Sequence, residues 1–185
     1  RLDTLDQLAS TLPISARDEA IALLASEIGK LPGLGDQARV LMKVAPHRPD
    51  LVLTAVKRLP SVEQRVEVWS AIAQYRPDEA LAAAQEVEEL GLRARLLTAV
   101  APHRPDQVLA AARELRYVDQ RVEVLAVLAH AQPDEVLRAS HESELRTTDR
   151  VKLLTAVASY RPNEVFAACS EISDLEQRVR VLVAL

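Results

Sequence analysis

The sequence predicts an all-α fold, a right-handed α-solenoid of about six tandem helix-turn-helix hairpins. Five prolines at residues 49, 77, 105, 133 and 162 recur at steps of 28, 28, 28 and 29 residues. Apolar residues recur around each proline with helical spacing. Hydrophobic residues make up 49% of the chain but aromatic residues only 3%, so the core must consist of Ala, Val and Leu, as in closely packed short helices.

The repeat divides the chain into two regions. Residues 1–35 predict a degenerate N-terminal repeat that ends in a turn rich in Gly and Pro. Residues 36–185 predict tandem 28-residue hairpins, of which the last is incomplete. We expect both regions to form a single elongated domain, because repeats of this kind are stable only when stacked on their neighbours.

Each repeat reads as two short helices, here called A and B. In residues 92–119 the A helix carries an apolar stripe from Ala94 to Ala101, and Pro102 stops it. Pro105 then opens the B helix, since proline fits best in the first helical turn. Asp106 follows in that turn, where a negative charge favours the helix dipole.

Two residues that could suggest special chemistry occupy ordinary core positions of the repeat. Trp69 stands where the other A helices carry leucine, and we interpret it as a core residue. Cys169 stands where other B helices carry alanine or valine, so it too predicts a small core residue. As the single cysteine, it excludes an internal disulfide.

The repeat pattern is similar to that of a known superfamily. The pattern combines Arg121-Val122-Glu123-Val124-Leu125, then Ala129, then Pro133-Asp134-Glu135-Val136-Leu137. It resembles short-repeat bacterial α-solenoids of the tetratricopeptide-like and HEAT-like helical-repeat superfamily, over roughly residues 36–185. It departs from the tetratricopeptide repeat in its 28-residue period and in lacking that family's A-helix pattern. The resemblance implies a superhelix that binds proteins, and it transfers no functional residue.

A column of arginines opens the A helices, and a column of glutamates lies seven or eight residues earlier, at the B-to-A turns. The arginines are Arg65, Arg93, Arg121, Arg150 and Arg178, and the glutamates are Glu86, Glu114, Glu142 and Glu171. One interpretation is a structural ladder of Arg–Glu pairs that staple these turns. The other is a row of guanidinium groups that grips carboxylates or phosphates.

Another A-helix column alternates in charge. Its members are Arg39, Glu67, Arg95, Glu123 and Lys152. Neighbouring helices pack about 8–10 Å apart, so these side chains can pair across repeats. Arg180 breaks the alternation, and the last interface should therefore lack the pair.

The A-to-B turns provide the main candidates for contact with a partner. They carry His47, Arg48, Tyr75, Arg76, His103, Arg104, Tyr160 and Arg161. Stacking would align them along one edge, and Tyr and Arg are common at binding hot spots. The alternative is local: each ring packs over its turn and each arginine pairs with a nearby aspartate.

A second candidate surface follows the A helices, where Ser70, Thr98, Ala126 and Thr155 share one position and Ala71, Ala99 and Ala156 the next. If these helices line a concave face, their small side chains leave a shallow groove for a peptide or helix. Close helix packing would demand the same small residues.

No catalytic, cofactor or metal motif is present, so we do not expect an enzyme. The net charge is −4 and the B helices carry acidic residues such as Glu86, Glu88 and Glu89, so we do not expect nucleic acid as a partner; a modular RNA binder is a further alternative. No apolar run approaches the ~20 residues of a membrane span, and no secretory leader is seen, so we expect a cytoplasmic protein.

The sequence thus favours a scaffold or recognition module that binds a protein or peptide on its turn edge or concave face. The alternative is a sensor or regulatory repeat region of a larger multidomain signalling or defence protein. Residues 177–185 predict an A helix that stops before its partner B helix and ends in apolar residues. This end predicts either a fragment of a longer array, which we favour, or an end-to-end homodimer.

Overall fold

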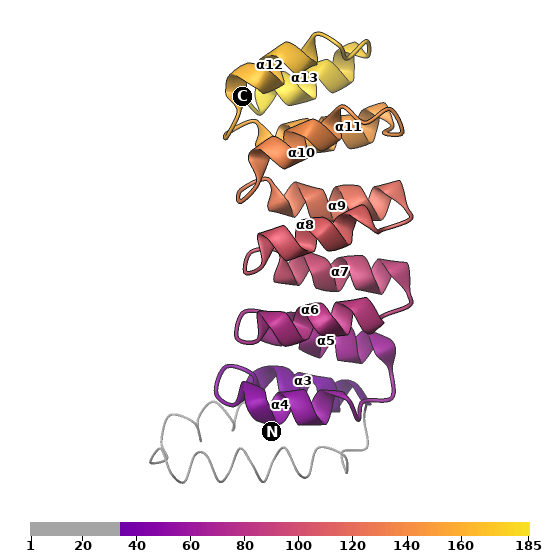
Figure 1. The fold of residues 1–185 in the computed structure, drawn as a ribbon, viewed down its shortest axis with the longest axis vertical. Coiled ribbons are helices and arrows are strands. Elements are labelled where there is room, and N and C mark those ends of the chain that lie inside the picture. The colour runs from indigo at the N-terminus through magenta and orange to yellow at the C-terminus, as the bar shows by residue number, and fades with distance from the viewer. Residues whose placement is uncertain (1–33) are drawn as a thin grey trace. The chain divides into compact units, whose positions relative to one another are not determined.

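The computed structural model of this 185-residue chain describes residues 34–185. Over those residues it contains eleven α-helices and no strand, which confirms the all-α prediction (Figure 1). The predicted N-terminal repeat over residues 1–35 lies outside the described residues, except for Leu34 and Gly35, which begin the first described helix.

The helices alternate between A and B types as the repeat predicts. The A helices are α3 (Leu34–Val44), α5 (Val62–Ile72), α7 (Leu90–Val100), α9 (Val118–Leu128), α11 (Thr147–Val157) and α13 (Leu175–Val183). The B helices are α4 (Pro49–Val56), α6 (Pro77–Glu86), α8 (Pro105–Arg113), α10 (Pro133–Ser140) and α12 (Pro162–Cys169).

The repeated proline sets the start of every B helix. Proline lacks the N–H that would need a cap at the first helical position, and its ring fixes φ near the helical value. The residue before it is not helical, with φ −139° and ψ 60° at Arg104 and φ −137° and ψ 60° at Arg161. The Arg104 N–H donates to the carbonyl of Val100 at 3.1 Å, which closes the tight A-to-B turn.

The chain divides into two compact units, residues 1–83 and 84–185, with the division inside α6. In the first unit α3 packs on both α4 and α5, and α4 packs on α5. In the second unit α7, α9, α11 and α13 pack one on the next and form an A layer. There α8, α10 and α12 each pack on the A helices before and after them. Each unit is thus a solenoid of helical hairpins, whereas the single domain and the right hand of the turn stay predictions.

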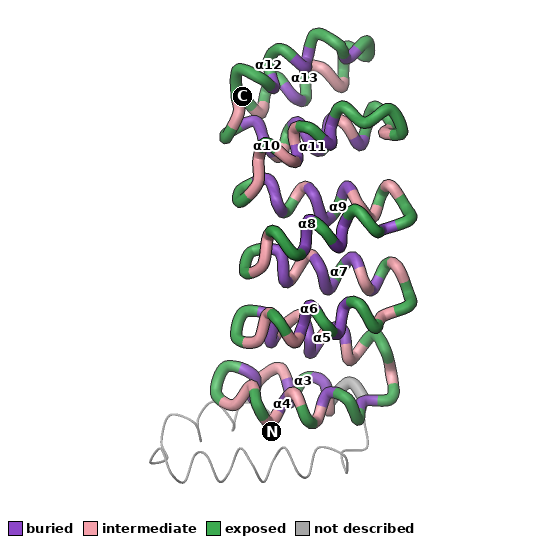
Figure 2. The backbone as a smooth tube through the Cα atoms, in the orientation of Figure 1, coloured by how far each residue is buried: buried purple, intermediate pink, exposed green. Residues whose placement is uncertain are grey.

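The core consists of the apolar columns that the repeat defines (Figure 2). Leu96, Val124 and Leu153 occupy one A-helix column and are fully buried. Trp69 is only 7% exposed and Cys169 only 3%, which confirms both as core residues. Since helices this short are marginal alone and each buried Leu or Val contributes about 1.5–3 kcal/mol, stacking supplies the stability.

Candidate interaction surfaces

The Arg–Glu ladder exists in the second unit, but its register differs from the one predicted. Arg93 Nη2 lies 3.4 Å from Glu114 Oε2, and Arg150 Nη2 lies 3.1 Å from Glu171 Oε2. Each of these glutamates lies 21 residues after its arginine, at the end of the B helix of the same hairpin. The predicted spacing of seven or eight residues before the arginine is therefore wrong. Because helices of one hairpin run antiparallel, the start of A lies beside the end of its own B.

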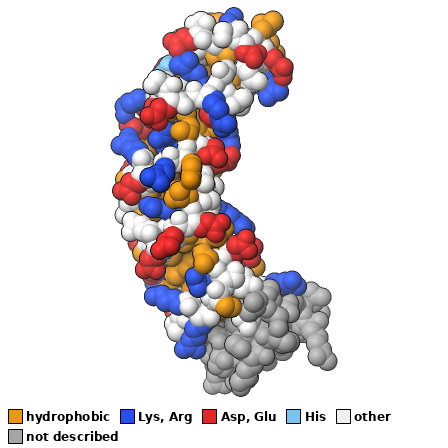
Figure 3. All heavy atoms as spheres, turned by 90° about the vertical axis from the view of Figure 1, so that its right-hand side faces the viewer, with side chains coloured by type: hydrophobic (Ala, Val, Ile, Leu, Met, Phe, Trp, Pro, Cys, Tyr) orange, Lys and Arg blue, Asp and Glu red, His pale blue; other side chains and the backbone are white. Residues whose placement is uncertain are grey.

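Arg121 pairs in the same way, with Glu142 at 3.1 Å and Glu144 at 3.5 Å. Glu86, the remaining predicted glutamate, is the last residue of α6 and is exposed. In Figure 3, basic and acidic side chains are mixed over the described surface in view. Because they are mixed with carboxylates, the arginines there do not form a row of free guanidinium groups that would bind phosphate.

The same arginine column also binds backbone carbonyls of the preceding B-to-A turn. Arg65 Nη1 donates to the Leu59 carbonyl at 2.9 Å, and Arg178 Nε donates to the Ile172 carbonyl at 2.8 Å. Arg150 Nε donates to the Ser140 carbonyl at 2.9 Å. Ser140 is the last residue of α10, whose terminal carbonyls lack intrahelical partners and lie at the negative end of the helix dipole, so a charged donor suits it. Leu59 and Ile172 lie in the turns, three residues after their B helices end.

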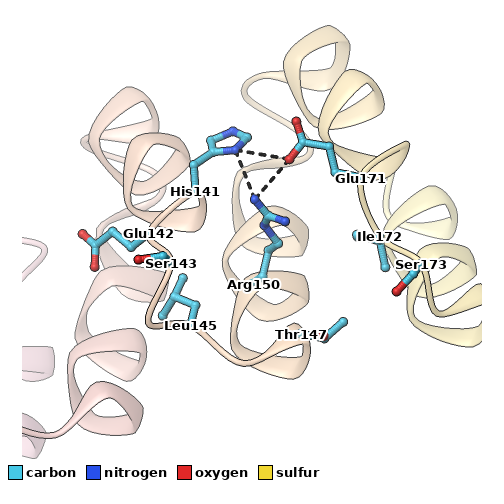
Figure 4. A pocket seen from close by; sticks show the side chains of 9 residues that line it. All are labelled: His141, Glu142, Ser143, Leu145, Thr147, Arg150, Glu171, Ile172 and Ser173. Carbon is cyan, nitrogen blue, oxygen red and sulfur yellow. Dashed lines mark hydrogen bonds and ion pairs between the residues drawn. The ribbon is translucent and has the colours of Figure 1, made fainter.

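Arg150 is the centre of a small polar cavity of about 160 Å³ in the second unit (Figure 4). Its Nη2 lies between His141 Nδ1, at 3.4 Å, and Glu171 Oε2. The cavity is lined by the turn after α10, which is the longest of the described B-to-A turns. The one 29-residue step in the sequence, from Pro133 to Pro162, places its extra residue in that turn. The longer step is the sequence signal for this cavity, which was not predicted from the sequence. Since Arg150 already bonds three groups, we assign the cluster a structural role.

The alternating charge column forms an ion pair between neighbouring A helices. Lys152 Nζ on α11 contacts Glu123 Oε1 on α9. Arg180, at the same position of α13, instead pairs with Glu176 of its own helix at 2.7 Å, as the broken alternation predicts. The other members, Arg39, Glu67 and Arg95, also interact with other groups.

The turn-edge candidates all lie in A-to-B turns, and several of them are held by local contacts. Arg48 donates from Nε and Nη2 to Asp50, at 3.1 and 2.8 Å. Arg76 lies 3.3 Å from Glu79. Tyr160 is 39% exposed, and its ring meets that of His130 edge to face, with centroids 5.6 Å apart. The remaining candidates are the exposed His47, Tyr75 and His103 and the half-buried Arg104, whose Nη1 donates to the His103 carbonyl.

Two contacts clasp successive A-to-B turns together in the second unit. Arg161 donates from Nε and Nη2 to Asp134 of the preceding hairpin, at 2.5 and 2.9 Å, and Gln132 contacts Asp106 in the same way. The Arg161 guanidinium lowers the pKa of the Asp134 carboxyl below its ordinary value, and the pKa of Arg161 is raised in turn. The sequence predicted pairing within one turn, whereas these clasps join neighbouring turns; their signal in the sequence is the constant spacing of the Arg and Asp columns.

The second candidate surface, here called the A face, consists of the outward residues of α7, α9 and α11. Its members are Arg95, Thr98, Ala99, Glu123, Ala126, Val127, Lys152, Thr155 and Ala156. Residues at i, i+3 and i+4 share one side of a helix, and none of these nine is buried. Val127 is the one large apolar side chain among them and is 41% exposed. The Glu123–Lys152 ion pair joins two helices of this face, and the Val127 side chain on it is exposed.

The described residues contain no group of three or more His, Cys, Asp or Glu that could hold a metal ion. Over the same part of the chain, no helix has the length and apolar character needed to cross a membrane. No protein-family model, curated protein or solved structure matches the sequence. The case for a function therefore depends on the surfaces themselves.

Proposed function

We propose that this chain is a protein-interaction module that binds a peptide or helix across the A face. The observation that carries the proposal is the repetition of one outward pattern on α7, α9 and α11, which pack consecutively within one unit. A charged residue, a small residue and a second small or apolar residue recur at i, i+3 and i+4 on each helix.

The dimensions fit a short ligand. Three helices at a spacing of about 9 Å span about 18 Å between the first and last axis. An extended chain rises about 3.3 Å per residue, so five or six residues cross the face. Val127, flanked by Ala126 and Ala156, offers a shallow apolar seat for one side chain of that segment. The Glu123–Lys152 pair beside it offers an acceptor and a donor for the backbone or polar groups.

The turn edge is the weaker candidate, because its arginines already make contacts within the fold. Arg161 clasps the neighbouring hairpin, and Arg48 and Arg76 hold carboxylates of their own B helix. A partner that recruited these guanidinium groups would have to replace contacts that already exist. The apolar side chains of Ala126, Val127 and Ala156 on the A face make no polar contact that a partner would have to replace.

The experiment is affinity capture from lysate of the source cells, with three forms of the chain as bait. The A-face variant is Val127→Arg with Thr155→Arg, and the matched turn-edge variant is His103→Ala with Arg104→Ala. All four positions are exposed or half-buried, so both variants should keep the wild-type circular dichroism spectrum. We expect a partner that is held by the wild type and the turn-edge variant, and lost from the A-face variant. Loss from the turn-edge variant alone, or capture of no partner by any form, would contradict the proposal.

A further inference from the structure

Among the described residues, α9 and α11 are each packed by two B helices, one before and one after, whereas α13 is packed only by α12 of the preceding hairpin. Val151 and Leu154 of α11 are 6% and 0% exposed, whereas the corresponding Val179 and Leu182 of α13 are 47% and 39% exposed. The large apolar residues exposed on α12 and after it are Phe166, Leu175, Val179, Leu182, Val183 and Leu185. On α11 these apolar positions are buried, and α12 and α13 are among the helices packed on it. On α13 the corresponding positions are exposed.

The arginine column gives a second, independent indication of the kind of helix that fits this face. In α7, α9 and α11 the Nη2 of the arginine reaches a glutamate at the end of the B helix of its own hairpin. Arg178 holds the same position on α13, but its Nη2 and Nε both donate to the Ile172 carbonyl. Its guanidinium is in place for a carboxylate that would come with a B helix.

We propose that α13 seats a short amphipathic helix of the B type, antiparallel to α13, with an acidic residue at its C-terminal end that pairs with Arg178. Such a helix presents the apolar column found in α8 and ends as α8 does, with Glu114 next to Leu115. The interface repeats one that the molecule already makes, since α8 packs on α7 and pairs Glu114 with Arg93.

The charges of α13 favour this occupant over a second copy of α13. A second α13 would bring Arg178 and Arg180 toward the same two cations. The acidic residue of α13 closest to them, Glu176, is already paired with Arg180. A B-type helix brings the carboxylate that Arg178 lacks, together with Ala and Leu side chains of the size that this face accommodates elsewhere.

The probe is the molecule's own B-helix segment, residues 104–116, as a capped synthetic peptide with a fluorescent label. Its binding is followed by anisotropy against wild-type protein and against Val179→Asp and Arg178→Gln. Because a free peptide of this length must fold as it binds, the segment is also tested in tethered form, with the sequence of residues 101–116 appended after Leu185. Leu185 corresponds to Val100, so the appended segment continues in the register of the α7–α8 hairpin.

The expected result is saturable binding of the peptide and a higher melting temperature for the tethered form. Val179→Asp should weaken binding of the peptide at least about tenfold, because it buries a charge in the interface. It should also abolish the gain in melting temperature of the tethered form. Arg178→Gln in the protein and Glu114→Gln in the peptide should each weaken binding about two- to fivefold. Both changes together should weaken binding no more than either one alone.

Three outcomes would overturn the proposal. The first is the absence of both peptide binding and a gain in melting temperature. The second is binding that Val179→Asp leaves unchanged. The third is sedimentation of the wild type as a dimer that Val179→Asp disperses and the peptide does not, since a second copy would then occupy the face.

Discussion

Replacing Arg150 by methionine should destabilise the second unit by about 2 kcal/mol. Methionine keeps the apolar stem of the side chain, which is only 25% exposed, and removes the guanidinium. The Ser140 carbonyl then loses a charged donor at 2.9 Å, and Ser140 is fully buried. A buried acceptor left without a partner costs about 1–3 kcal/mol. The lost contact with Glu171 adds at most about 1 kcal/mol, because that carboxylate is 54% exposed.

The assay is urea unfolding followed by far-ultraviolet circular dichroism, with amide hydrogen exchange in the turn after α10 as a local readout. Exchange is needed because long repeat arrays can unfold in more than one step. Glu171→Gln is the first control and should cost no more than about 1 kcal/mol. Arg113→Met is the second, because Arg113 pairs with Glu135 at 2.8 Å but is 63% exposed. If Arg150→Met costs no more than Arg113→Met, the carbonyl contact does not stabilise the turn and the reasoning is refuted.

Three further predictions concern the core, the clasp and the cysteine. Leu154→Ala should cost about 2–5 kcal/mol in urea unfolding and Leu182→Ala clearly less, because the first side chain is fully buried and the second is 39% exposed; equal costs would contradict the burial pattern. The lowered pKa of Asp134 beside Arg161 means that their contact stabilises the fold above the unfolded-state pKa near ~4 and is lost as pH falls through the lower folded-state pKa. The free energy of unfolding should therefore vary less with pH in Asp134→Asn than in the wild type over that range. An equal dependence on pH in both proteins would count against the clasp. Burial raises the pKa of the Cys169 thiol, so a thiol reagent should modify it far more slowly in native protein than in urea.

The sequence predicts the helices well because their determinants are local. Proline at the first helical position fixes where each B helix begins, and all five repeated prolines open a B helix in the structure. The apolar columns likewise identify the core, including Trp69 in its leucine position. Both signals depend on spacing within one short segment, and a regular repeat presents them several times.

The pairing of side chains was harder to predict, because several registers satisfy the same columns. Arg121 follows Glu114 by seven residues and precedes Glu142 by 21, and the sequence does not say which carboxylate is nearer. Hairpin geometry decides for Glu142, since the end of a B helix lies beside the start of its own A helix. The carbonyl acceptors of Leu59 and Ile172 were missed entirely, because a backbone acceptor has no residue type to recognise.

Site-specific photo-crosslinking tests the central claim, that the A face binds a partner, most directly. A benzophenone amino acid would replace Val127 on the A face in one form and Tyr160 on the turn edge in another. Both side chains are exposed to a similar degree, at 41% and 39%, so the two positions are matched in access. After irradiation in source cells, we expect a specific protein adduct at Val127 and none at Tyr160. An adduct at Tyr160 alone would contradict it and would assign recognition to the turns.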